Sequence, residues 1–252
     1  MCTLSWQIDD SFRLSLFFNR DELFSRPDAL PPKVHQPDAN SARFIAPTDP
    51  QGGGTWIAAN EFGITLCLLN DYQGRSVENL NDKAKSRGLL VRELIALKSA
   101  KEVESAMNLS RVKVFQPFNL VMFDGVKSPV MWNWDGERLH YTNEPAHPIV
   151  SAGIAQPEVQ RKRAAVFREE TERQGGKLTS AQQLALHRSK RPEPQPWSIA
   201  MQLDDKGTVS ITQVEVLVKG DGARNGYEMK MRYWPGKPLE ATPEPYEATL
   251  GD

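Results

Sequence analysis

Apolar and polar residues alternate along both ends of the chain, which is the pattern of half-buried β-strands. Residues 2–8 and 12–18 form two such runs around an Asp-Asp-Ser turn and predict a hairpin. Similar runs, bounded by Gly, Asn, Asp or Pro, predict further strands at 43–46, 55–59, 64–69, 118–124, 129–134, 138–141, 149–150, 198–203, 208–218 and 227–233.

Helical spacing of apolar residues is confined to the middle of the chain. It predicts helices at 87–97, 101–107, 158–172 and 180–186. Thr179 followed by Gln182 matches a capping box at the start of the last helix. Because strands and helices do not alternate as β-α-β units, the sheets should be antiparallel and the fold class α+β. Residues 26–53 are rich in Pro, Asp and Gly and predict a long surface excursion.

Charge and composition exclude several classes of protein. Lys and Arg number 31 against 32 Asp and Glu, so the net charge gives no argument for a nucleic-acid or membrane-surface partner. The short basic stretch at 188–191 lacks interleaved aromatic residues and does not change this expectation. No apolar run is long enough for a transmembrane helix, and we expect no signal peptide. The two cysteines form no disulfide framework, so a cytoplasmic location is expected.

Cys2 is the residue whose position suggests chemistry. If Met1 is removed, Cys2 carries both a thiol and a free α-amine, which together supply a nucleophile and its base. The predicted hairpin returns Arg20 and Asp21 beside the start of the chain, where Asp21 would hold the ammonium group and Arg20 would favour the thiolate. The alternative is that Cys2 is a buried strand residue and that the Arg20-Asp21 pair is a solvated turn.

Other candidate residues follow from local sequence. The glycines before Thr55 lack the Gly-Lys-Ser/Thr of a phosphate loop, so they indicate a backbone that passes close to a neighbour, followed by a buried Trp56. Asn70 ends an apolar strand and is either an oxyanion donor or a turn residue. Cys67 lies within that strand and is expected in the core. The histidines show no ligand spacing, so no metal site is expected; they are His35, His140, His147 and His187.

Taken in order, these motifs resemble the NRDE family, also called the transport and Golgi organisation 2 family. The resemblance covers about residues 1–236, which implies a single domain there, and the Pro- and Glu-rich segment 237–252 is expected to be a flexible tail. The residues that carry the resemblance are Met1-Cys2, Asn19-Arg20-Asp21-Glu22, Ser25-Arg26-Pro27, Gly53-Gly54-Thr55-Trp56, Leu69-Asn70-Asp71-Tyr72, Phe118-Asn119-Leu120 and Met231-Arg232-Tyr233-Trp234-Pro235-Gly236.

That family is similar to the cysteine branch of the N-terminal nucleophile hydrolases, which contains penicillin V acylase and bile salt hydrolase. The resemblance implies a four-layer αββα sandwich of two antiparallel sheets. By position, Cys2 matches the nucleophile, Arg20 and Asp21 match the pair around it, and Asn70 matches an oxyanion donor. Trp56, Asn119 and Ser151 are the expected substrate-binding residues.

Two positions depart from the pattern of the relatives. Many relatives carry a Gly-Leu-Ser-Asn stretch before the central helix, whose Asn is a second oxyanion donor. Residues 149–154 contain no Asn, so Ser151 or a backbone amide would have to substitute. Arg232 is the candidate for a later arginine of that branch.

The resemblance leaves two functions open. The first is an amidohydrolase that cleaves a linear, non-peptide amide of a small molecule through Cys2, without a cofactor. The second is a non-enzymatic haem or lipid carrier on the same scaffold, although the sequence has no Cys-x-x-Cys-His motif. In either case specificity should come from the loops at 26–53 and 142–157.

Overall fold

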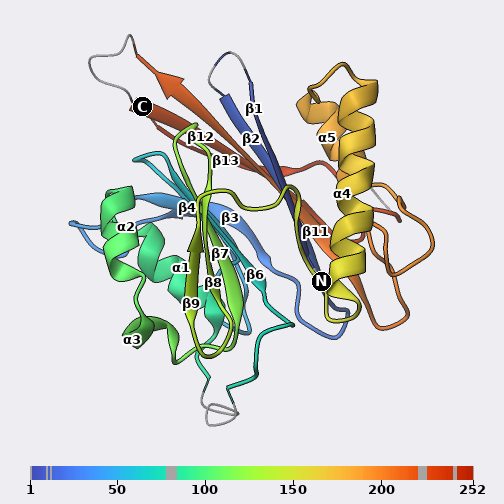
Figure 1. Ribbon diagram of the computed structural model, residues 1–252. Helices are drawn as coiled ribbons and strands as arrows, with labels where there is room; N and C mark the ends of the chain where they lie inside the picture. Colours follow the sequence, from blue (N-terminus) through green and yellow to red (C-terminus); the bar gives the residue numbers. More distant parts are fainter. Residues whose placement is uncertain are drawn as a thin grey trace.

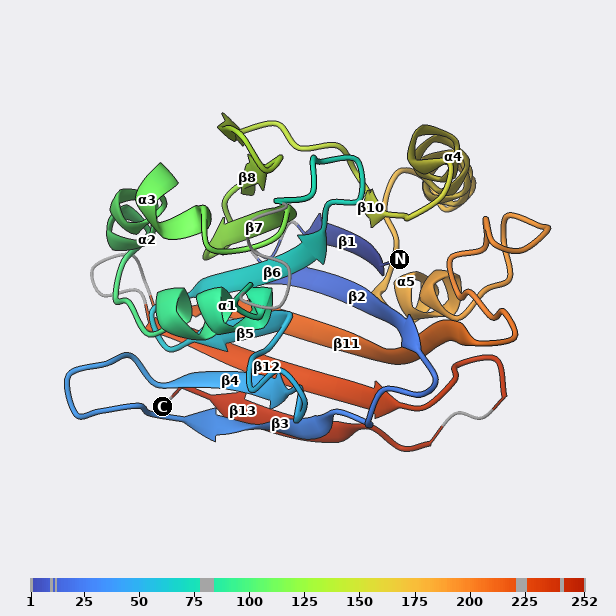
Figure 2. The same cartoon turned by 90° about the horizontal axis from the view of Figure 1, so that it is seen from below.

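Two antiparallel sheets lie face to face between two layers of helices in the computed structural model (Figure 1 and Figure 2). The predicted α+β class and four-layer αββα sandwich are therefore confirmed. The structure describes residues 2–9, 11, 13–77, 84–220, 226–240 and 243–251. Met1, Phe12 and residues 78–83 are among those that lie outside these ranges.

The first sheet has six strands and contains both chain ends that the structure describes. Its spatial order is β10 (Ile149–Ser151), β1 (Cys2–Ile8), β2 (Arg13–Leu23), β11 (Lys206–Lys219), β12 (Gly226–Pro235) and β13 (Tyr246–Leu250). The hairpin predicted at the start of the chain is confirmed by the pairing of β1 with β2, from Cys2 opposite Arg20 to Ile8 opposite Leu14. On its other side Cys2 pairs with Ser151 of β10.

The second sheet has seven strands that follow one another in chain order. They are β3 (Leu30–His35), β4 (Phe44–Thr48), β5 (Ile57–Asn60), β6 (Ile64–Asn70), β7 (Phe118–Asp124), β8 (Val130–Trp134) and β9 (Leu139–Thr142). Both faces of this sheet are covered. Leu66 and Leu68 of β6 pack with the helices, whereas Cys67 and Leu69 pack between the two sheets. This double burial explains why β6 is continuously apolar, and it places Cys67 in the core as expected.

Three helices cover the outer face of the seven-stranded sheet, namely α1 (Arg87–Ile95), α2 (Ala100–Ala106) and α3 (Leu109–Val112). On the opposite side of the molecule, α4 (Gln156–Arg173) and α5 (Ser180–His187) cover the six-stranded sheet. The capping box predicted for α5 is confirmed, because Thr179 and Gln182 bond each other's backbone N–H groups.

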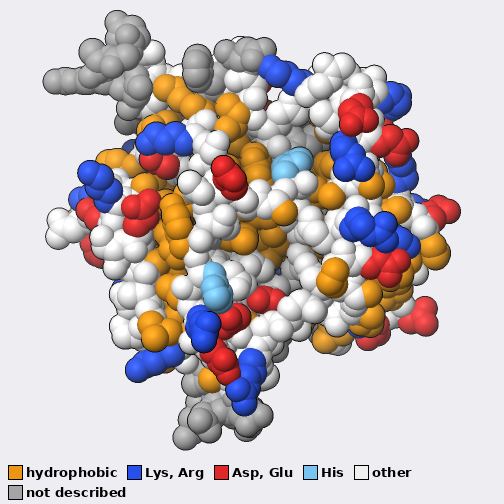
Figure 3. Space-filling view, viewed as in Figure 1, with side chains coloured by type: hydrophobic (Ala, Val, Ile, Leu, Met, Phe, Trp, Pro, Cys, Tyr) orange, Lys and Arg blue, Asp and Glu red, His pale blue; other side chains and the backbone are white. Residues whose placement is uncertain are grey.

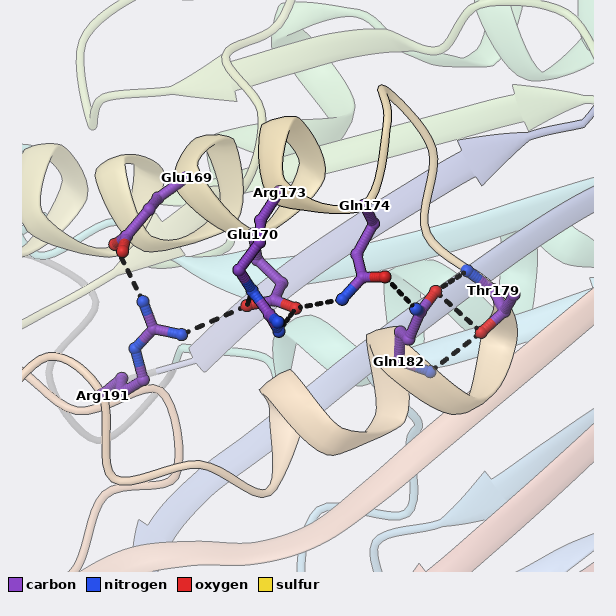
Figure 4. Close-up of polar contacts among 7 residues, drawn as sticks. All are labelled: Glu169, Glu170, Arg173, Gln174, Thr179, Gln182 and Arg191. Carbon is purple, nitrogen blue, oxygen red and sulfur yellow. Dashed lines mark hydrogen bonds and ion pairs between the residues drawn. The ribbon is translucent and has the colours of Figure 1, made fainter.

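A chain of polar contacts joins α4, α5 and the segment that follows them (Figure 4). Arg191 contacts Glu169 at 2.8 Å and Glu170 at 3.3 Å. Gln174 donates to Glu170 at 3.0 Å and accepts from Gln182 at 2.6 Å. The two helices that cover β1 and β2 are therefore tied to each other at one end, which fixes this layer over the start of the chain.

The surface carries charges of both signs. Figure 3 shows basic and acidic side chains interspersed over one face, which agrees with the net charge of −1. Within the described part of the chain, none of the helices combines the length and hydropathy needed to cross a bilayer.

The segment predicted as an excursion at 26–53 contains two strands, β3 and β4. The short strand expected at 43–46 overlaps the first three residues of β4. We did not predict β3 from the sequence because Pro31 and Pro32 have no N–H group to donate to a neighbouring strand. The pairing of β3 with β4 shifts register between Leu30 and Lys33, where these prolines lie. As an edge strand, β3 tolerates these prolines.

The strand predicted at 198–203 is not formed. Its backbone instead bonds to the turn that precedes it, with Ile199 N donating to Arg191 O at 2.8 Å and Ala200 N donating to Ser189 O at 2.9 Å. A single bridge at Gln202 is all that remains of a ladder among these residues. The apolar run is buried beneath the helical layer, as the exposed fraction of 0% for Ile199 shows.

The expectation of a flexible tail after residue 236 does not hold for β13. This strand pairs with β12 from Met229 opposite Leu250 to Tyr233 opposite Tyr246. Leu250 is buried, and Glu247 bonds to Arg232 at 2.7 Å and to Lys230 at 2.9 Å. Along this strand, Leu250 is buried and Glu247, on the opposite face, forms ion pairs, as expected for period-2 alternation. We did not predict this strand because the tail as a whole is rich in Pro and Glu.

Candidate active site

A cavity of about 530 Å³ opens between the ends of β1, β2 and β6 and the start of α1. Five of the residues singled out from the sequence line it, namely Cys2, Arg20, Asp21, Trp56 and Asn70. The remaining described lining residues are Glu22, Arg26, Asp49, Gln51, Gly52, Gly54, Thr55, Leu68, Ala84, Lys85, Ser86, Arg87, Gly88 and Gln116. The structure thus brings together residues that are up to 68 positions apart within the first 70 of the chain.

Cys2 is partly exposed at one end of β1, between Arg20 of β2 and Ser151 of β10. Burial raises the pKa of its thiol, and the nearby charge of Asp21 raises it further. A hydrogen bond from the Asp21 backbone and the charge of Arg20 lower that pKa. The net effect is a raised pKa, and the groups of the hairpin that positions Cys2 offset part of the effect of burial.

Arg20 is held against Trp56. The guanidinium carbon lies 4.6 Å from the centroid of the Trp56 ring, and Nη2 lies 3.7 Å from Glu22 Oε2. Both Arg20 and Trp56 are buried. A cation over an indole face is an attractive arrangement, so Trp56 orients the positive charge that acts on Cys2.

The glycines before Trp56 permit a close approach to α1. A Cβ at Gly54 would lie 2.2 Å from the carbonyl carbon of Gly88, a distance that no side chain can adopt. Thr55 N donates to Gly88 O at 3.1 Å. The expectation that this backbone passes close to a neighbour is confirmed, and the contact places the start of α1 beside Trp56.

Asp21 is buried next to Cys2. Its Oδ1 accepts a hydrogen bond from Thr208 Oγ1 at 2.6 Å, whereas Oδ2 has no partner among the described residues. Burial raises the pKa of this carboxyl, while the charge of Arg163 and the bond from Thr208 lower it. A buried oxygen without a donor is costly, so the site has one acceptor still available beside the start of the chain.

Arg163 was not recognised in the sequence. It lies in α4, its side chain is fully buried, and it donates to Thr3 Oγ1 at 2.5 Å and to Trp197 O at 2.9 Å. Burial lowers its pKa, and the charges of Asp21 and Cys2 raise it. The sequence signal that could have revealed it is its spacing. Arg163 stands four residues after Val159 and four before Phe167, so it lies on the apolar, buried face of the helix, where a charged residue is unusual.

Arg232, the candidate for a later arginine, lies elsewhere. It is in β12, where it bonds to Glu215 at 2.5 Å and to Glu247 at 2.7 Å, and it does not line the cavity. Of these two arginines, Arg163 rather than Arg232 acts electrostatically on Cys2 and Asp21.

The end of β6 faces the cavity through Asn70. Asn70 Nδ2 donates to the Tyr72 hydroxyl at 3.1 Å, and the Asn70 carbonyl accepts from Ser151 Oγ at 2.5 Å. Ser151 itself does not line the cavity, so its contribution is to hold Asn70 against β10. Asn119 also lies outside the lining and accepts from Asn133 Nδ2 at 2.9 Å.

The segment expected to supply a second oxyanion donor is used structurally. Gln156, at the start of α4, donates to Val150 O at 2.6 Å and accepts from Ala152 N. No described residue of 149–156 lines the cavity. Besides Asn70, the lining side chains with an amide are Gln51 and Gln116.

The donor set does not favour a metal or haem. The described residues contain no group of three His, Cys, Asp or Glu that could hold a metal ion. The described lining of the cavity includes no His or Met and is mainly charged or polar. Cys2 is a residue type that can ligate haem iron, but a porphyrin also needs largely apolar walls, which this mainly charged and polar lining does not supply.

Comparisons with known proteins agree with this description. The family model for Transport and Golgi organisation 2 matches residues 1–176. A search of curated proteins finds no match. Among solved structures, penicillin V acylase from Agrobacterium tumefaciens is similar, with a TM-score of 0.56 and 12% identity over 99% of this chain and 86% of that chain.

Two further solved structures show the same fold. The C2A mutant of conjugated bile acid hydrolase from Clostridium perfringens has a TM-score of 0.55 and 10% identity, over 99% of this chain and 96% of that one. The N-acylethanolamine-hydrolyzing acid amidase ortholog of Caenorhabditis elegans has a TM-score of 0.53 and 11% identity, over 84% and 92%. At this level of identity the likeness shows the fold alone, which is that of the N-terminal nucleophile hydrolases.

Proposed function

Since this chain belongs to the transport and Golgi organisation 2 family, and its Cys2 opens on a cavity, we propose that it is an amidohydrolase acting on small molecules. The nucleophile is Cys2 after removal of Met1. The observation that carries the proposal is that three residues line one cavity. They are Cys2, Asn70 and Asp21, whose Oδ2 atom has no partner among the described residues.

Each group has a role that follows from its chemistry. The α-amine of Cys2 accepts the thiol proton, and the thiolate attacks the carbonyl carbon of the amide. Asn70 donates to the oxygen that becomes negative. The C–N bond then breaks as the leaving amine takes the proton from the α-ammonium, which leaves a thioester on Cys2. Water, deprotonated by the same amine, hydrolyses the thioester to a free acid.

Asp21 would position the α-amine. Its Oδ2 lacks a donor among the described residues and lies in the carboxyl that acts electrostatically on Cys2. An ammonium at the processed terminus would supply that donor. Burial raises the pKa of Asp21, and the charge of Arg163 in the helical layer acts against that effect, which favours the ionised carboxylate as the acceptor.

The cavity volume supports a small-molecule substrate, because about 530 Å³ falls within the usual range of ligand pockets. The similar structures are named as an acylase, a bile acid hydrolase and an acid amidase. A carrier function for haem gains no support from the lining residues, so we do not propose it.

The test is the mature N-terminus together with the reactivity of its thiol. Intact-mass and peptide mass spectrometry should show loss of Met1 and alkylation of Cys2 by iodoacetamide well before Cys67, whose pKa is raised by complete burial. Cys2→Ala should abolish the fast labelling, and Cys67→Ala should keep it. A retained Met1, or equal labelling of both thiols, contradicts the proposal.

A further inference from the structure

Some charged side chains that line the cavity form ion pairs with one another, and others do not. Those that line it are Arg20, Arg26, Lys85 and Arg87 on the basic side and Asp21, Glu22 and Asp49 on the acidic side. Burial makes an unbalanced charge costly, and several of these charged groups are buried or partly buried. The pairing of each charge therefore indicates what the cavity can accept.

Two of the three lining carboxylates, Glu22 and Asp49, form ion pairs with lining arginines. Asp49 Oδ2 lies 2.5 Å from Arg26 Nη2, and Glu22 Oε2 lies 3.6 Å from Arg26 Nε and 3.7 Å from Arg20 Nη2. Asp21 forms no ion pair among the described residues; burial raises its pKa, and the charge of Arg163 acts against that effect. Arg20 and Arg26 are compensated by Glu22 and Asp49, and no described carboxylate of the lining forms an ion pair with Lys85 or Arg87.

Arg87, the first residue of α1, is a lining cation without a partner carboxylate among the described residues. Its Nη1 donates to Pro117 O at 2.9 Å, but it forms no ion pair with a described carboxylate. The described first turn of α1 also contains no acidic residue. A guanidinium has five N–H donors, so most of them are available to a ligand.

Arg87 lines the same cavity as Cys2. Burial lowers its pKa, and the charges of Tyr72 and Cys2 raise it. A group held by Arg87 would therefore lie in the cavity onto which the thiol opens. Lys85, exposed nearby in the lining, adds positive charge without a described partner.

We infer that Arg87 binds a carboxylate of the substrate, so that the cavity selects amides carrying an anionic group near the scissile bond. The planar fork of a guanidinium matches the two oxygens of a carboxylate and forms two parallel hydrogen bonds with it. The position of the anion relative to a scissile bond rests on the proposed function. The anion site itself does not.

The experiment compares two small amides that differ in charge. N-acetylglycine carries an amide and a carboxylate, and N-acetylglycinamide is its neutral counterpart. Dissociation constants are measured by NMR titration with the Cys2→Ala protein, which cannot turn over either compound. We expect N-acetylglycine to bind about tenfold more tightly, and Arg87→Gln to remove that preference.

Arg92→Gln is the matched control. Arg92 lies in the same helix and likewise donates to a backbone carbonyl, that of Gly53 at 2.8 Å, but it does not line the cavity. This variant should keep the preference. Arg87→Lys should keep part of it, because the charge remains and the fork is lost. Thermal unfolding of each variant establishes that the protein is folded during the titration.

Three results would overturn the inference: equal affinity for the two compounds, binding of neither, or a preference that survives in Arg87→Gln. They are separable from failure of the proposed function. An unreactive Cys2 refutes the enzyme and leaves the anion site standing. A reactive Cys2 in a protein without acid preference refutes the anion site alone.

Discussion

Asn19 Oδ1 lies 2.7 Å from Nδ1 of His187 in the buried layer between β2 and α5. Asn19 and Arg20 are consecutive, and their side chains point to opposite faces of the strand. Asn19 faces the helices, while Arg20 faces Trp56 and the cavity. The Asn-Arg-Asp-Glu run therefore combines one residue that holds the fold with neighbours that form the site.

The hydrogen bonds around His187 determine its protonation. Asn19 Nδ2 donates to the carbonyls of His187 and Ile199, so Asn19 Oδ1 must accept from His187 Nδ1. His187 Nε2 then accepts from Ser5 Oγ at 2.7 Å, and Ser5 Oγ accepts from Gln183 Nε2 at 2.8 Å. Every member is satisfied when the imidazole is neutral.

Replacing Asn19 by Ala should destabilise the protein without removing the thiol chemistry. The change deletes three hydrogen bonds and leaves two carbonyls and His187 Nδ1 without partners in a buried layer. We expect the free energy of unfolding to fall by at least about 3 kcal/mol in urea titrations. Asn40→Ala, at an exposed loop position, should change it by less than about 0.5 kcal/mol. An unchanged midpoint for Asn19→Ala contradicts the structural role.

Acid should destabilise the protein through the same histidine. Burial lowers the pKa of His187 to about 3, against about 6.5 in an unfolded chain. Between these values the unfolded state binds a proton that the folded state does not, so stability rises with pH by about 1.4 kcal/mol per unit. His147, whose burial lowers its pKa to about 4, adds to the slope above pH 4. The full stability is present above about pH 6.5 and is lost as the pH falls.

Urea unfolding at a series of pH values between 4 and 7 measures this slope. His187→Gln should reduce it by about half, because His147 remains. Asn40→Ala, which removes no titratable side chain, should leave it unchanged. A slope that is the same in wild type and His187→Gln would show that His187 is not the titrating group.

The parts of this structure that the sequence predicted are local. Cys2 and Arg20 are joined by a hairpin whose two strands each show period-2 alternation, so their meeting required no knowledge of the rest of the chain. Arg87 lines the cavity because α1 docks on one sheet, and Arg163 acts on Cys2 and Asp21 because α4 docks on the other; no local pattern records that docking. β3 and β13 were missed because edge strands tolerate prolines and charges that a composition-based prediction assigns to loops. Asn119 was expected at the cavity from its motif, but β7 places it next to Asn133 instead.

A methyl group at Gly54 should disturb the start of α1. The added Cβ would lie 2.2 Å from a backbone carbon of Gly88, and backbone cannot rotate away as a side chain can. We expect Gly54→Ala to lower the free energy of unfolding by about 3 kcal/mol or more and to slow alkylation of Cys2, because Trp56 and Arg20 shift with the segment. Gly226→Ala is the control, since a Cβ there meets nothing within 4 Å. Equal stability of the two variants contradicts the close approach.

The pH dependence of thiol alkylation should report the charge of Arg20. Arg20 lowers the pKa of the Cys2 thiol against the effect of burial. Removing the positive charge in Arg20→Gln disfavours the thiolate, so the curve of labelling rate against pH should move to higher pH, and labelling at pH 7 should slow by about threefold to tenfold. Rates are measured with iodoacetamide by peptide mass spectrometry between pH 6 and 10. Arg138→Gln, which removes an exposed arginine before β9, should leave the curve in place. A curve for Arg20→Gln that coincides with wild type would show that the guanidinium does not act on the thiol, and Trp56 would then orient it for another purpose.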